Sequence, residues 1–445
     1  MSYDVIVVGG GIGGLTAAAL LARRGLNVCL LERQSEVGGC AATVAHLNYR
    51  FDPTYGLHTG WEPGGICARL FDQLGVTPPA AQEVPQAYVV RLADGVDIPR
   101  PSTLRQFEDD LRSAFPECAD EATDFYHGIL ESERRTEADT VGASLAGSPS
   151  RFQNFIDIQL QTLTQSSLAE CSYELAAQAL DPRQRFWRLA GGIQSLIDRL
   201  VRSFQQSGGR LRLNAPVLRL AYGPDGVPIG VDLLNGERVL ATRAIVSNLT
   251  IWDTFGKLVG PARTPRTISS ALKELSGWGV YQMFLTTSES AASQLPAERM
   301  LTVTDTSEDA LERGGLVLAL GQRDSRDART AVVTVYTHPD DWFSFHEDHA
   351  ALEEREQAML STTWAQLHST VPELANEIEL IETATPHTFY ENFRRRFGII
   401  GRPFKQSAVP TPFPNLWLVG DTTARGLGID GIIDHARQTA DRITE

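Results

Sequence analysis

The sequence is short of basic residues and of cysteine. It has 40 lysines and arginines against 55 acidic residues, which gives a formal net charge of −15 at pH 7. A chain with this charge is not expected to bind nucleic acid, because proteins bind the phosphate backbone with basic surfaces. Lysine occurs only at Lys257, Lys273 and Lys405. The five cysteines form no C-x-x-C pair, which is typical of free thiols in a reducing compartment, so we expect a cytoplasmic location.

The sequence also lacks a run of apolar residues long enough to span a membrane. Residues 5–22 carry no charge, but glycines interrupt them at 9–14, no basic segment precedes them, and Arg23 and Arg24 follow directly. This pattern fits neither a spanning helix nor a signal peptide. At 445 residues the chain exceeds one simple core, so we expect two domains or one large interrupted domain.

The strongest motif lies near the beginning of the sequence. An apolar run at 5–8 is followed by glycines with G-x-G-x-x-G spacing (Gly9, Gly11 and Gly14), a helix-forming stretch, a second apolar run and Glu32. In such a unit the first glycine allows a tight turn, the second lets backbone approach a pyrophosphate, and the third lets the helix pack on the strand. The helix N-terminus stabilises the phosphate charge, and the carboxylate of the acid accepts hydrogen bonds from the ribose hydroxyls. The unit predicts a dinucleotide site and leaves NAD, NADP and FAD open.

The far end of the sequence carries a second motif. An apolar run at 416–419 is closed by Gly420 and Asp421, and a helix is expected over about 432–443. Asp421 can accept hydrogen bonds from ribityl hydroxyls, and the helix N-terminus can stabilise negative charge on a reduced flavin. A Gly-Asp pair is common by chance. Together with the glycine unit, however, it favours FAD over a nicotinamide cofactor.

The segments between the two motifs predict a second sheet. Four strand-like runs between 278 and 337 have no helices between them, which favours antiparallel pairing. Residues 84–101 have the pattern of a hairpin. The helical stretch 151–168 has an apolar stripe that either faces a core or forms one wall of an apolar substrate tunnel.

One short segment combines carboxylates with imidazoles. It contains His346, Glu347, Asp348 and His349. The spacing differs from the H-E-x-x-H zinc pattern, and acids are favourable at the start of a helix without any metal. We therefore predict no metal site.

Taken together, these motifs resemble the amine-oxidase-like flavoprotein superfamily over nearly the whole chain. The resemblance rests on the glycine unit, the glycine pairs at 38–39 and 191–192, the segment 216–217, and Gly420 and Asp421 with Gly428. Within the superfamily, four segments are most similar to the phytoene-desaturase-like carotenoid desaturases and isomerases, nearest the 3',4'-desaturases and the prolycopene isomerases. These segments are 51–52, 62–65, 155–160 and 385–389.

The resemblance implies an α/β fold with two parts. A Rossmann-type FAD-binding domain with a parallel, glutathione-reductase-like sheet is expected to carry an inserted α+β substrate domain built on an antiparallel sheet. The FAD-binding domain is expected to be discontinuous (1–75, 190–265 and 405–445), and the substrate domain is expected to comprise 76–189 and 266–404.

The resemblance also assigns residues to FAD and to a substrate. The expected FAD contacts are Gly9, Gly11, Ile12, Gly13, Gly14, Glu32, Arg33, Gly39, Ala41, Val217, Gly420, Asp421, Gly428 and Ile429. The candidate substrate contacts are Trp61, Phe155, Trp278 and Tyr281. A lipophilic substrate implies an encounter with a membrane surface, for which the apolar faces of 151–168 and 278–285 are candidates.

The implied activity is FAD-dependent oxidation of a C–C bond in a lipophilic polyene or isoprenoid. Flavin N5 takes a hydride and a base takes a proton. Asp430 and His58 are the candidate bases, although Asp430 can instead cap the last helix and His58 can be a hydrogen-bonded loop residue. Members of the family often carry a Pro-Gly-x-Gly-x-Pro-like segment after the Gly-Asp pair. This chain has Arg425 and Asp430 there instead, which weakens the expectation of a plain hydrocarbon substrate.

Other functions of the same fold stay open. A carotene cis–trans isomerase would use the flavin without net redox change, and a polyene saturase would add hydrogens. An amine oxidase usually needs a lysine near the flavin, for which Lys273 is the candidate. A flavin-free prenyl-binding protein of the GDP-dissociation-inhibitor type is disfavoured by the intact glycine set with Glu32 and Asp421. The sequence predicts no oligomeric state.

Overall fold

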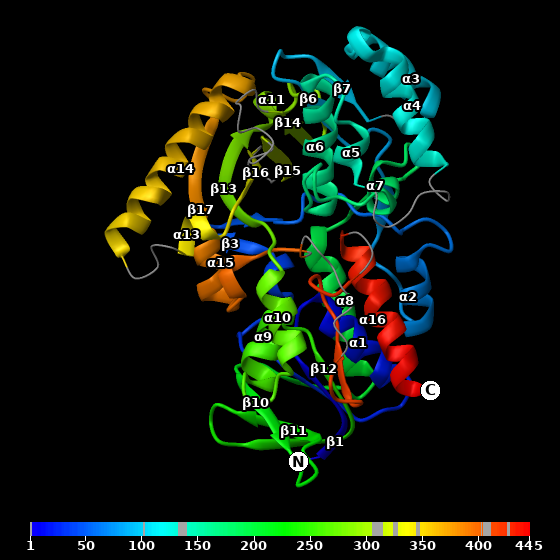
Figure 1. Cartoon of the computed structure of the whole chain (residues 1–445), viewed down its shortest axis with the longest axis vertical. Coiled ribbons are helices and arrows are strands. Elements are labelled where there is room, and N and C mark those ends of the chain that lie inside the picture. Colours follow the sequence, from blue (N-terminus) through cyan, green and yellow to red (C-terminus); the bar gives the residue numbers. More distant parts are fainter. Residues whose placement is uncertain are drawn as a thin grey trace.

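The computed structural model describes residues 2–100, 103–131, 140–304, 315–323, 328–343, 348–401, 403, 411–424 and 428–445. Figure 1 shows an elongated molecule with one sheet in its lower half and a second sheet in its upper half, and with both labelled termini near the lower end. Within the described residues, none of the helices has the length and apolar character that crossing a bilayer requires.

The lower sheet is built around β1. Its strands are β1 (Ser2–Val8), β2 (Val28–Leu31), β9 (Arg210–Arg212), β10 (Val217–Tyr222), β11 (Pro228–Leu233), β12 (Arg238–Ser247) and β18 (Leu416–Leu418). β1 pairs in parallel with β2 and β12, β2 with β9, and β12 with β18. β10, β11 and the first part of β12 form an antiparallel meander at one side. This arrangement confirms the predicted Rossmann-type parallel sheet.

Alternating residues of β1 enter two different cores, which explains its continuous apolar run. Val5 and Val7 pack in one cluster with the helices α1 (Ile12–Arg23), α2 (Ile66–Leu74), α8 (Gly192–Gln206) and α16 (Gly428–Thr444). Ile6 and Val8 pack on the other face, in a cluster with α9 (Ile251–Asp253) and α10 (Arg266–Glu274). A parallel strand covered on both faces has no solvent side, so every position is apolar. Figure 1 shows α1, α8 and α16 side by side.

The upper sheet has the order β17-β13-β16-β15-β14-β6-β7. Its strands are β6 (Val89–Arg91), β7 (Asp97–Pro99), β13 (Gly279–Ser288), β14 (Met300–Val303), β15 (Leu316–Arg323), β16 (Ala328–Thr337) and β17 (Ile378–Ala384). All pairs are antiparallel except β14 with β6, which are parallel. The predicted antiparallel sheet is therefore correct with one exception. The expected hairpin at 84–101 is also present, as β6 and β7, and the long connection from it to β14 makes the parallel pair possible.

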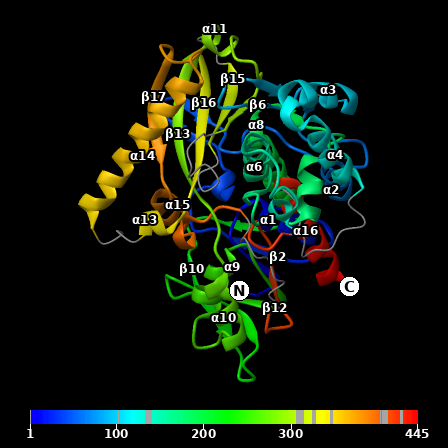
Figure 2. The same ribbon diagram turned by 45° about the horizontal axis from the view of Figure 1, so that its top comes forward.

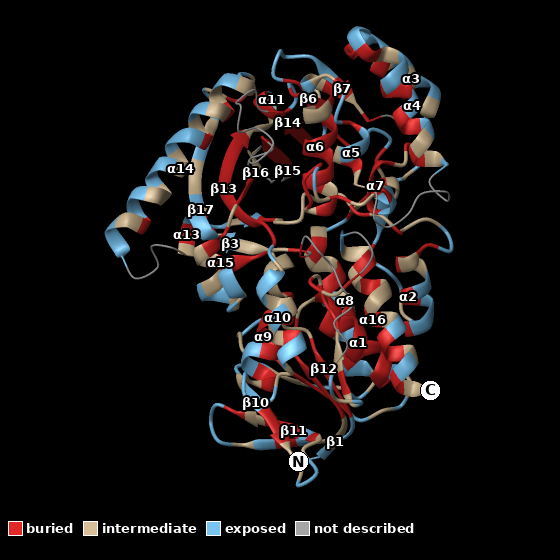
Figure 3. Ribbon diagram, viewed as in Figure 1, coloured by how far each residue is buried: buried red, intermediate tan, exposed pale blue. Residues whose placement is uncertain are grey.

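The two faces of the upper sheet have different surroundings. One face is covered by α14 (His349–Thr370), and alternating β13 residues such as Tyr281, Met283 and Leu285 pack there in a buried cluster. Both ribbon views place α14 along this sheet (Figures 1 and 2). Burial is nearly complete along β13, whereas the outer side of α14 is exposed (Figure 3). The opposite face, with Val280 and Gln282, borders the functional site.

A helical lobe packs beside the upper sheet. It contains α3 (Leu104–Ala114), α4 (Ala119–Leu130), α5 (Val141–Ser144), α6 (Ser150–Thr164) and α7 (Tyr173–Leu180). The predicted helix at 151–168 corresponds to α6, whose Phe152 and Phe155 lie in a core with Phe115 and Phe125. Most of its stripe therefore faces this core, whereas Leu163, near the end of α6, borders the functional site together with Val280 of β13. The proposed membrane-facing role of these two segments is wrong, because their apolar side chains are buried inside the protein.

The remaining elements are short. They are a 3-10 turn (Gly39–Ala41), β3 (Val44–His46), β4 (Tyr49–Phe51), β5 (Ala81–Glu83), a 3-10 turn (Pro116–Cys118), β8 (Trp187–Leu189), a π-helical turn (Thr254–Val259), α11 (Glu289–Ala292), α13 (Asp340–Phe343), α15 (Pro386–Phe393) and a 3-10 turn (Arg396–Gly398). The predicted division into two domains stays a prediction, and its last boundary, at 404–405, lies outside the described residues.

The ion-pair group around Arg91 offers a test of how the upper sheet is held. Arg91 is 8% exposed. Its guanidinium lies between two carboxylates. It donates to both carboxylate oxygens of Asp97 and to both of Glu373, at 2.7–3.0 Å, and so ties the hairpin to the segment after α14. We expect Arg91→Ala to lower the free energy of unfolding in urea by about 2–4 kcal/mol, because two carboxylates lose their partner. Arg112→Ala removes an exposed pair with Asp120 and serves as the control, with an expected change below about 1 kcal/mol. Equal effects of the two substitutions would contradict this account.

Candidate functional site

One cavity of about 2840 Å³ extends from the lower sheet to the upper sheet. Its wall includes the glycine turn after β1, the segment 32–44, the beginning of α16, and residues of β13 and β16. Pockets for one small ligand are typically about 300–1,000 Å³. The cavity is therefore large enough for a dinucleotide and a second ligand together.

The glycine turn leaves no space for side chains where the first helix meets the first strand. Gly9 has φ +99° and donates to Leu31 O at 2.9 Å. A Cβ on Gly14 would lie 2.2 Å from Gly9 O, and one on Gly11 would lie 2.5 Å from the Asn248 side chain. Helix α1 begins directly after Gly11, so its unpaired N–H groups lie at the cavity wall. This cradle fits the diphosphate of a dinucleotide.

Glu32 is held in place by backbone groups. Its carboxylate accepts from Gly10 N at 2.6 Å and from Gln34 N at 2.8 Å, and it lines the cavity. Each carboxylate oxygen keeps acceptor capacity beyond these bonds, which suits the two ribose hydroxyls of an adenosine. A 2'-phosphate would meet repulsion from the same charge.

The segment after Glu32 runs back along the glycine turn. Gly38 has φ +115° and donates to Gly10 O at 2.8 Å, and a Cβ on Gly39 would lie 3.4 Å from the Gly11 Cα. Arg33 and Ala41 also line the cavity. Gly38 and Gly39 are therefore small residues at positions where their backbone lies against the glycine turn. The Arg33 guanidinium donates to Asn392 O.

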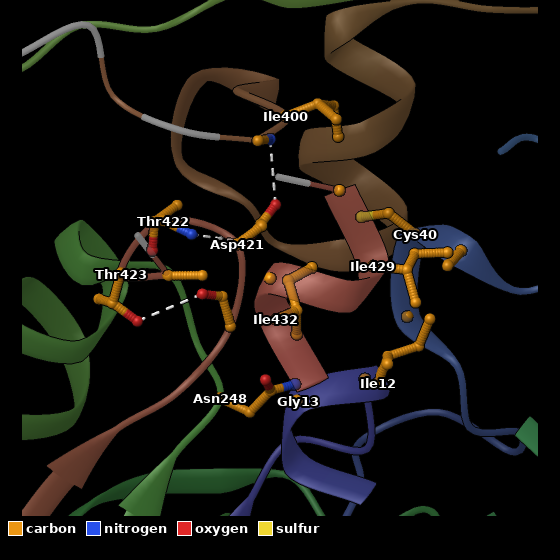
Figure 4. Close-up of a pocket in the computed structure, with 18 of the residues that line it drawn as sticks. Ile12, Gly13, Cys40, Asn248, Ile400, Asp421, Thr422, Thr423, Ile429 and Ile432 are labelled. Atoms are coloured by element: carbon orange, nitrogen blue, oxygen red, sulfur yellow. Dashed lines mark hydrogen bonds between the residues drawn. The ribbon is translucent and has the colours of Figure 1, made fainter. Parts of the chain in front are cut away.

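Asn248 is part of the cradle and was missed by sequence reasoning. Its N–H donates to Val8 O at 2.8 Å, and its side chain lies against the glycine turn (Figure 4). A Cβ on Gly13 would lie 2.8 Å from Asn248 Oδ1 and 3.0 Å from Gly420 N. Asn248 directly follows β12, which pairs in parallel with β1, so it reaches the same sheet edge as Gly9. The only signal in the sequence is that Asn248 is a polar residue shortly after the apolar run 244–246.

Asp421 lies at the wall of the same cavity (Figure 4). Its carboxylate is already ion-paired with Arg395. Its Oδ2 accepts from Arg395 Nη2 at 2.7 Å and from Gly401 N at 3.0 Å. Burial lowers the pKa of Arg395, but the Asp421 carboxylate, Cys40 and Asp253 together outweigh burial and hold the pKa above its usual value. Arg395 was also missed, because nothing in the sequence links it to a residue 26 positions away. The predicted contact of Asp421 with ribityl hydroxyls stays a prediction.

Both predicted catalytic residues line the cavity. Asp430 is in the first turn of α16, after Gly428 and Ile429, and its Cβ is 3.3 Å from where a Cβ on Gly60 would stand. Burial raises the pKa of Asp430 to about 6, and the nearby Glu62 adds to the shift. His58 is two positions before Gly60. Arg425, the other charged residue expected near the flavin, lies outside the described residues.

His58 is buried and neutral. It is 6% exposed and lines the cavity, and its backbone pairs with Trp187 at 2.7 and 2.8 Å. Burial lowers the pKa of His58, although Asp52 raises it by a smaller amount. Its Nε2 has no hydrogen-bond partner among the described residues. An imidazole nitrogen is therefore available at the cavity wall.

The predicted substrate residues need correction. Trp61 lines the cavity. Phe155 packs 5.2 Å from the Phe115 ring, Trp278 packs 4.3 Å from the His338 ring, and Tyr281 stacks on Trp342. None of these three lines the cavity. Tyr281 is on the wrong face of β13, because side chains alternate along a strand.

The described lysines and acids give no support for lysine or metal chemistry. Lys257 borders the cavity, but its Nζ pairs with Asp253 at 2.7 Å and donates to Arg394 O. Lys273 is exposed on α10 and does not line the cavity, while Lys405 lies outside the described residues. No group of three or more potential metal ligands occurs within the described part of the chain, which excludes 344–347.

The contact between Gly14 and Gly9 generates a test of the cradle. We expect Gly14→Ala to push α1 away from β1, lower stability by about 1–3 kcal/mol, and remove most bound flavin. Visible flavin absorbance per protein and urea unfolding measure the two effects. Gly147→Ala is the control, because a Cβ there meets nothing within 4 Å. A Gly14→Ala protein with full flavin content would overturn this interpretation of the turn.

Comparison with known proteins identifies the family. Residues 12–444 match the family described as flavin containing amine oxidoreductase. Among curated proteins, prolycopene isomerase 2 of an Oncidium hybrid cultivar is 26% identical over 294 residues (58% of this chain, 50% of the relative). All-trans-retinol 13,14-reductase of Danio rerio is 23% identical over 331 residues (61% and 51%), and phytoene desaturase of Cercospora nicotianae is 24% identical over 301 residues (58% and 47%).

The chain thus spans about half the length of the curated relatives it matches. Among solved structures, an oxidoreductase from Methanosarcina mazei matches with a TM-score of 0.75 at 15% identity, covering 99% of this chain and 100% of that chain. This likeness confirms the predicted fold. The cradle and the family match agree on the cofactor. The chain belongs to the flavin-containing amine oxidoreductase family, and its cofactor is FAD.

Proposed function

We propose that the protein is an FAD-dependent oxidoreductase that removes hydrogen from a C–C bond of a lipophilic polyene. The observation that carries the proposal is the continuous cavity, which joins the dinucleotide cradle to the inner face of the upper sheet. Relatives named as a phytoene desaturase, a prolycopene isomerase and a retinol reductase support a polyene substrate. Peripheral contact with a membrane stays a prediction.

The residues of this chain have three tasks in the proposed reaction. The glycine turn and the α1 N-terminus bind the diphosphate, and Glu32 binds the adenosine ribose. The buried walls of the cavity keep water from the reacting carbons. When bound, FAD supplies the two-electron acceptor that takes up hydride. A group of this chain must then accept the proton that leaves the neighbouring carbon.

Asp430 is the residue that we propose as the proton acceptor. It lines the cavity at the first turn of α16, and its pKa of about 6 keeps it largely ionised at neutral pH while making it a better base than an ordinary carboxylate. His58 is the second candidate, because its free Nε2 also borders the cavity. The α16 N-terminus provides a favourable site for the negative charge of Asp430.

Two rival functions receive less support from the structure. An amine oxidase with a lysine-held water has no suitable lysine among the described residues, since Lys257 is ion-paired and Lys273 does not line the cavity. A flavin-free prenyl-binding protein has no need of the cradle, whose closest contacts exclude any side chain at Gly11 and Gly14. The isomerase and saturase reactions use the same cavity and are separated by their products.

Product analysis tests the proposed reaction directly. We expect flavin-loaded protein, incubated anaerobically with a panel of carotenoids and shorter polyenes, to yield a product with two hydrogens fewer and to bleach the flavin band. Mass spectrometry and absorbance measure the two changes. The Gly14→Ala protein without flavin is the control. A product of unchanged mass would identify an isomerase, and one with two additional hydrogens would identify a saturase, so either result would overturn the desaturase proposal.

The pH dependence of the rate tests the role of Asp430. If Asp430 must be ionised, the rate of flavin reduction by substrate rises with pH through about 6 and is level above it. We expect Asp430→Asn to lower the rate about a hundredfold or more and to abolish this rise, with flavin content retained. His58→Gln should keep the rise. An unchanged pH profile in Asp430→Asn, together with its loss in His58→Gln, would assign the base to His58.

A further inference from the structure

The inner face of the upper sheet carries a group of neutral polar side chains. Gln282 on β13 pairs directly across the sheet with Thr334 on β16, and Tyr336 follows two residues later on the same face. All three line the cavity and are at most 4% exposed. Tyr55, from the loop after β4, also lines the cavity, and its hydroxyl contacts the hydroxyl of Tyr336. We call these four residues the polar cluster.

The polar cluster is linked by hydrogen bonds but incompletely satisfied. Gln282 Nε2 donates to Thr334 Oγ1 at 3.1 Å, and the hydroxyls of Tyr55 and Tyr336 lie 2.8 Å apart. Gln282 Oε1 has no hydrogen-bond partner among the described residues. Buried polar atoms are normally paired, because leaving one unpaired costs free energy. Since Gln282 borders the cavity, the missing donor can come from a ligand.

The polar cluster carries no charge. Burial raises the pKa of Tyr55 to about 12 and raises the pKa of Tyr336 well above its ordinary value, so both phenols stay protonated at neutral pH. Apolar side chains pack around Tyr336, including Phe51, Val280 and Phe284. A carboxylate or ammonium in this position would lose its hydration without gaining an opposite charge. The cluster therefore suits an uncharged group.

A hydroxyl matches these requirements better than a carbonyl. The free Gln282 Oε1 is an acceptor and needs a donor, which a hydroxyl supplies and a carbonyl does not. A pure hydrocarbon would leave Gln282 Oε1 unpaired.

We propose that the polar cluster binds an uncharged hydroxyl group on the otherwise apolar substrate, so that the enzyme selects a hydroxylated polyene over the corresponding hydrocarbon. This inference rests on the proposed function, because it takes the second ligand of the cavity to be a polyene. The apolar side chains around the polar cluster bind the hydrocarbon chain of the substrate. The polar cluster determines which end of the substrate lies at this part of the cavity.

Binding of matched ligand pairs tests the proposal without requiring turnover. The pairs are all-trans-retinol with its deoxy hydrocarbon, and an acyclic 40-carbon carotene with its terminal hydroxy derivative; retinoic acid tests a charged end group. Each is offered in detergent micelles to the flavin-loaded protein, and the polyene that coelutes on gel filtration is measured by its own absorbance. Wild-type protein should retain the hydroxylated member of at least one pair roughly three- to tenfold more tightly, and retinoic acid no better than the hydrocarbon.

Two substitutions remove the cluster, and a third controls for them. Gln282→Leu and Tyr336→Phe should each abolish the preference for the hydroxyl while leaving hydrocarbon binding within about twofold. Tyr281→Phe is the matched control. Tyr281 occupies the position directly before Gln282 on β13, and its side chain lies on the opposite face of the sheet, toward α14. This variant should keep the preference. Flavin content and thermal unfolding show whether each variant is folded, and the use of two cluster variants keeps the test valid if one is not.

The outcomes separate this inference from the proposed function. A wild-type protein that binds both members of every pair equally, or binds neither, would overturn the inference. An equal loss of the preference for the hydroxylated ligand in Tyr336→Phe and in Tyr281→Phe would also overturn the inference. Selective retention of the hydroxylated polyene without any product formation would support the inference and count against the proposed reaction.

Discussion

The close approach of α1 to β1 is the constraint on which the site depends. A Cβ on Gly14 would meet the Gly9 carbonyl at 2.2 Å, so at this point the helix contacts the turn after β1 through backbone alone. This contact aims the α1 N-terminus at the cavity and places Gly11 beside Asn248. The parallel strands on either side of β1 then bring Glu32 and Asn248 to the same sheet edge. A dinucleotide site is thus a consequence of how tightly one helix packs.

The parts of the structure that sequence reasoning predicted are local or repetitive. The glycine spacing with Glu32, the hairpin at 84–101 and the last helix each arise from neighbouring residues, whose conformational preferences are visible in the sequence. Arg395 and Asn248 could not be predicted, because their roles depend on contacts between distant segments. The Asp421–Arg395 pair joins two loops that only the completed fold brings together.

The failed substrate predictions have a different cause. Phe155, Trp278 and Tyr281 have aromatic side chains, which suit a lipophilic ligand, but such large side chains also contribute strongly to the stability of protein cores. On β13 the correct face was one residue away, at Val280 and Gln282. The residues that border the substrate part of the cavity include amides and hydroxyls, and nothing in their spacing distinguishes them from structural ones.

The last helix gives the site an order of assembly. Residues at the beginning of the chain form the cradle, whereas Gly420, Asp421 and the N-terminus of α16 come from its last 26 residues. During synthesis the ribosome releases β1 and α1 first, and roughly 20–90 s pass at about 5–20 residues per second before α16 emerges. Throughout that interval the nascent chain has one half of a cofactor site. Stable capture of FAD is therefore a late event, coupled to the synthesis of α16.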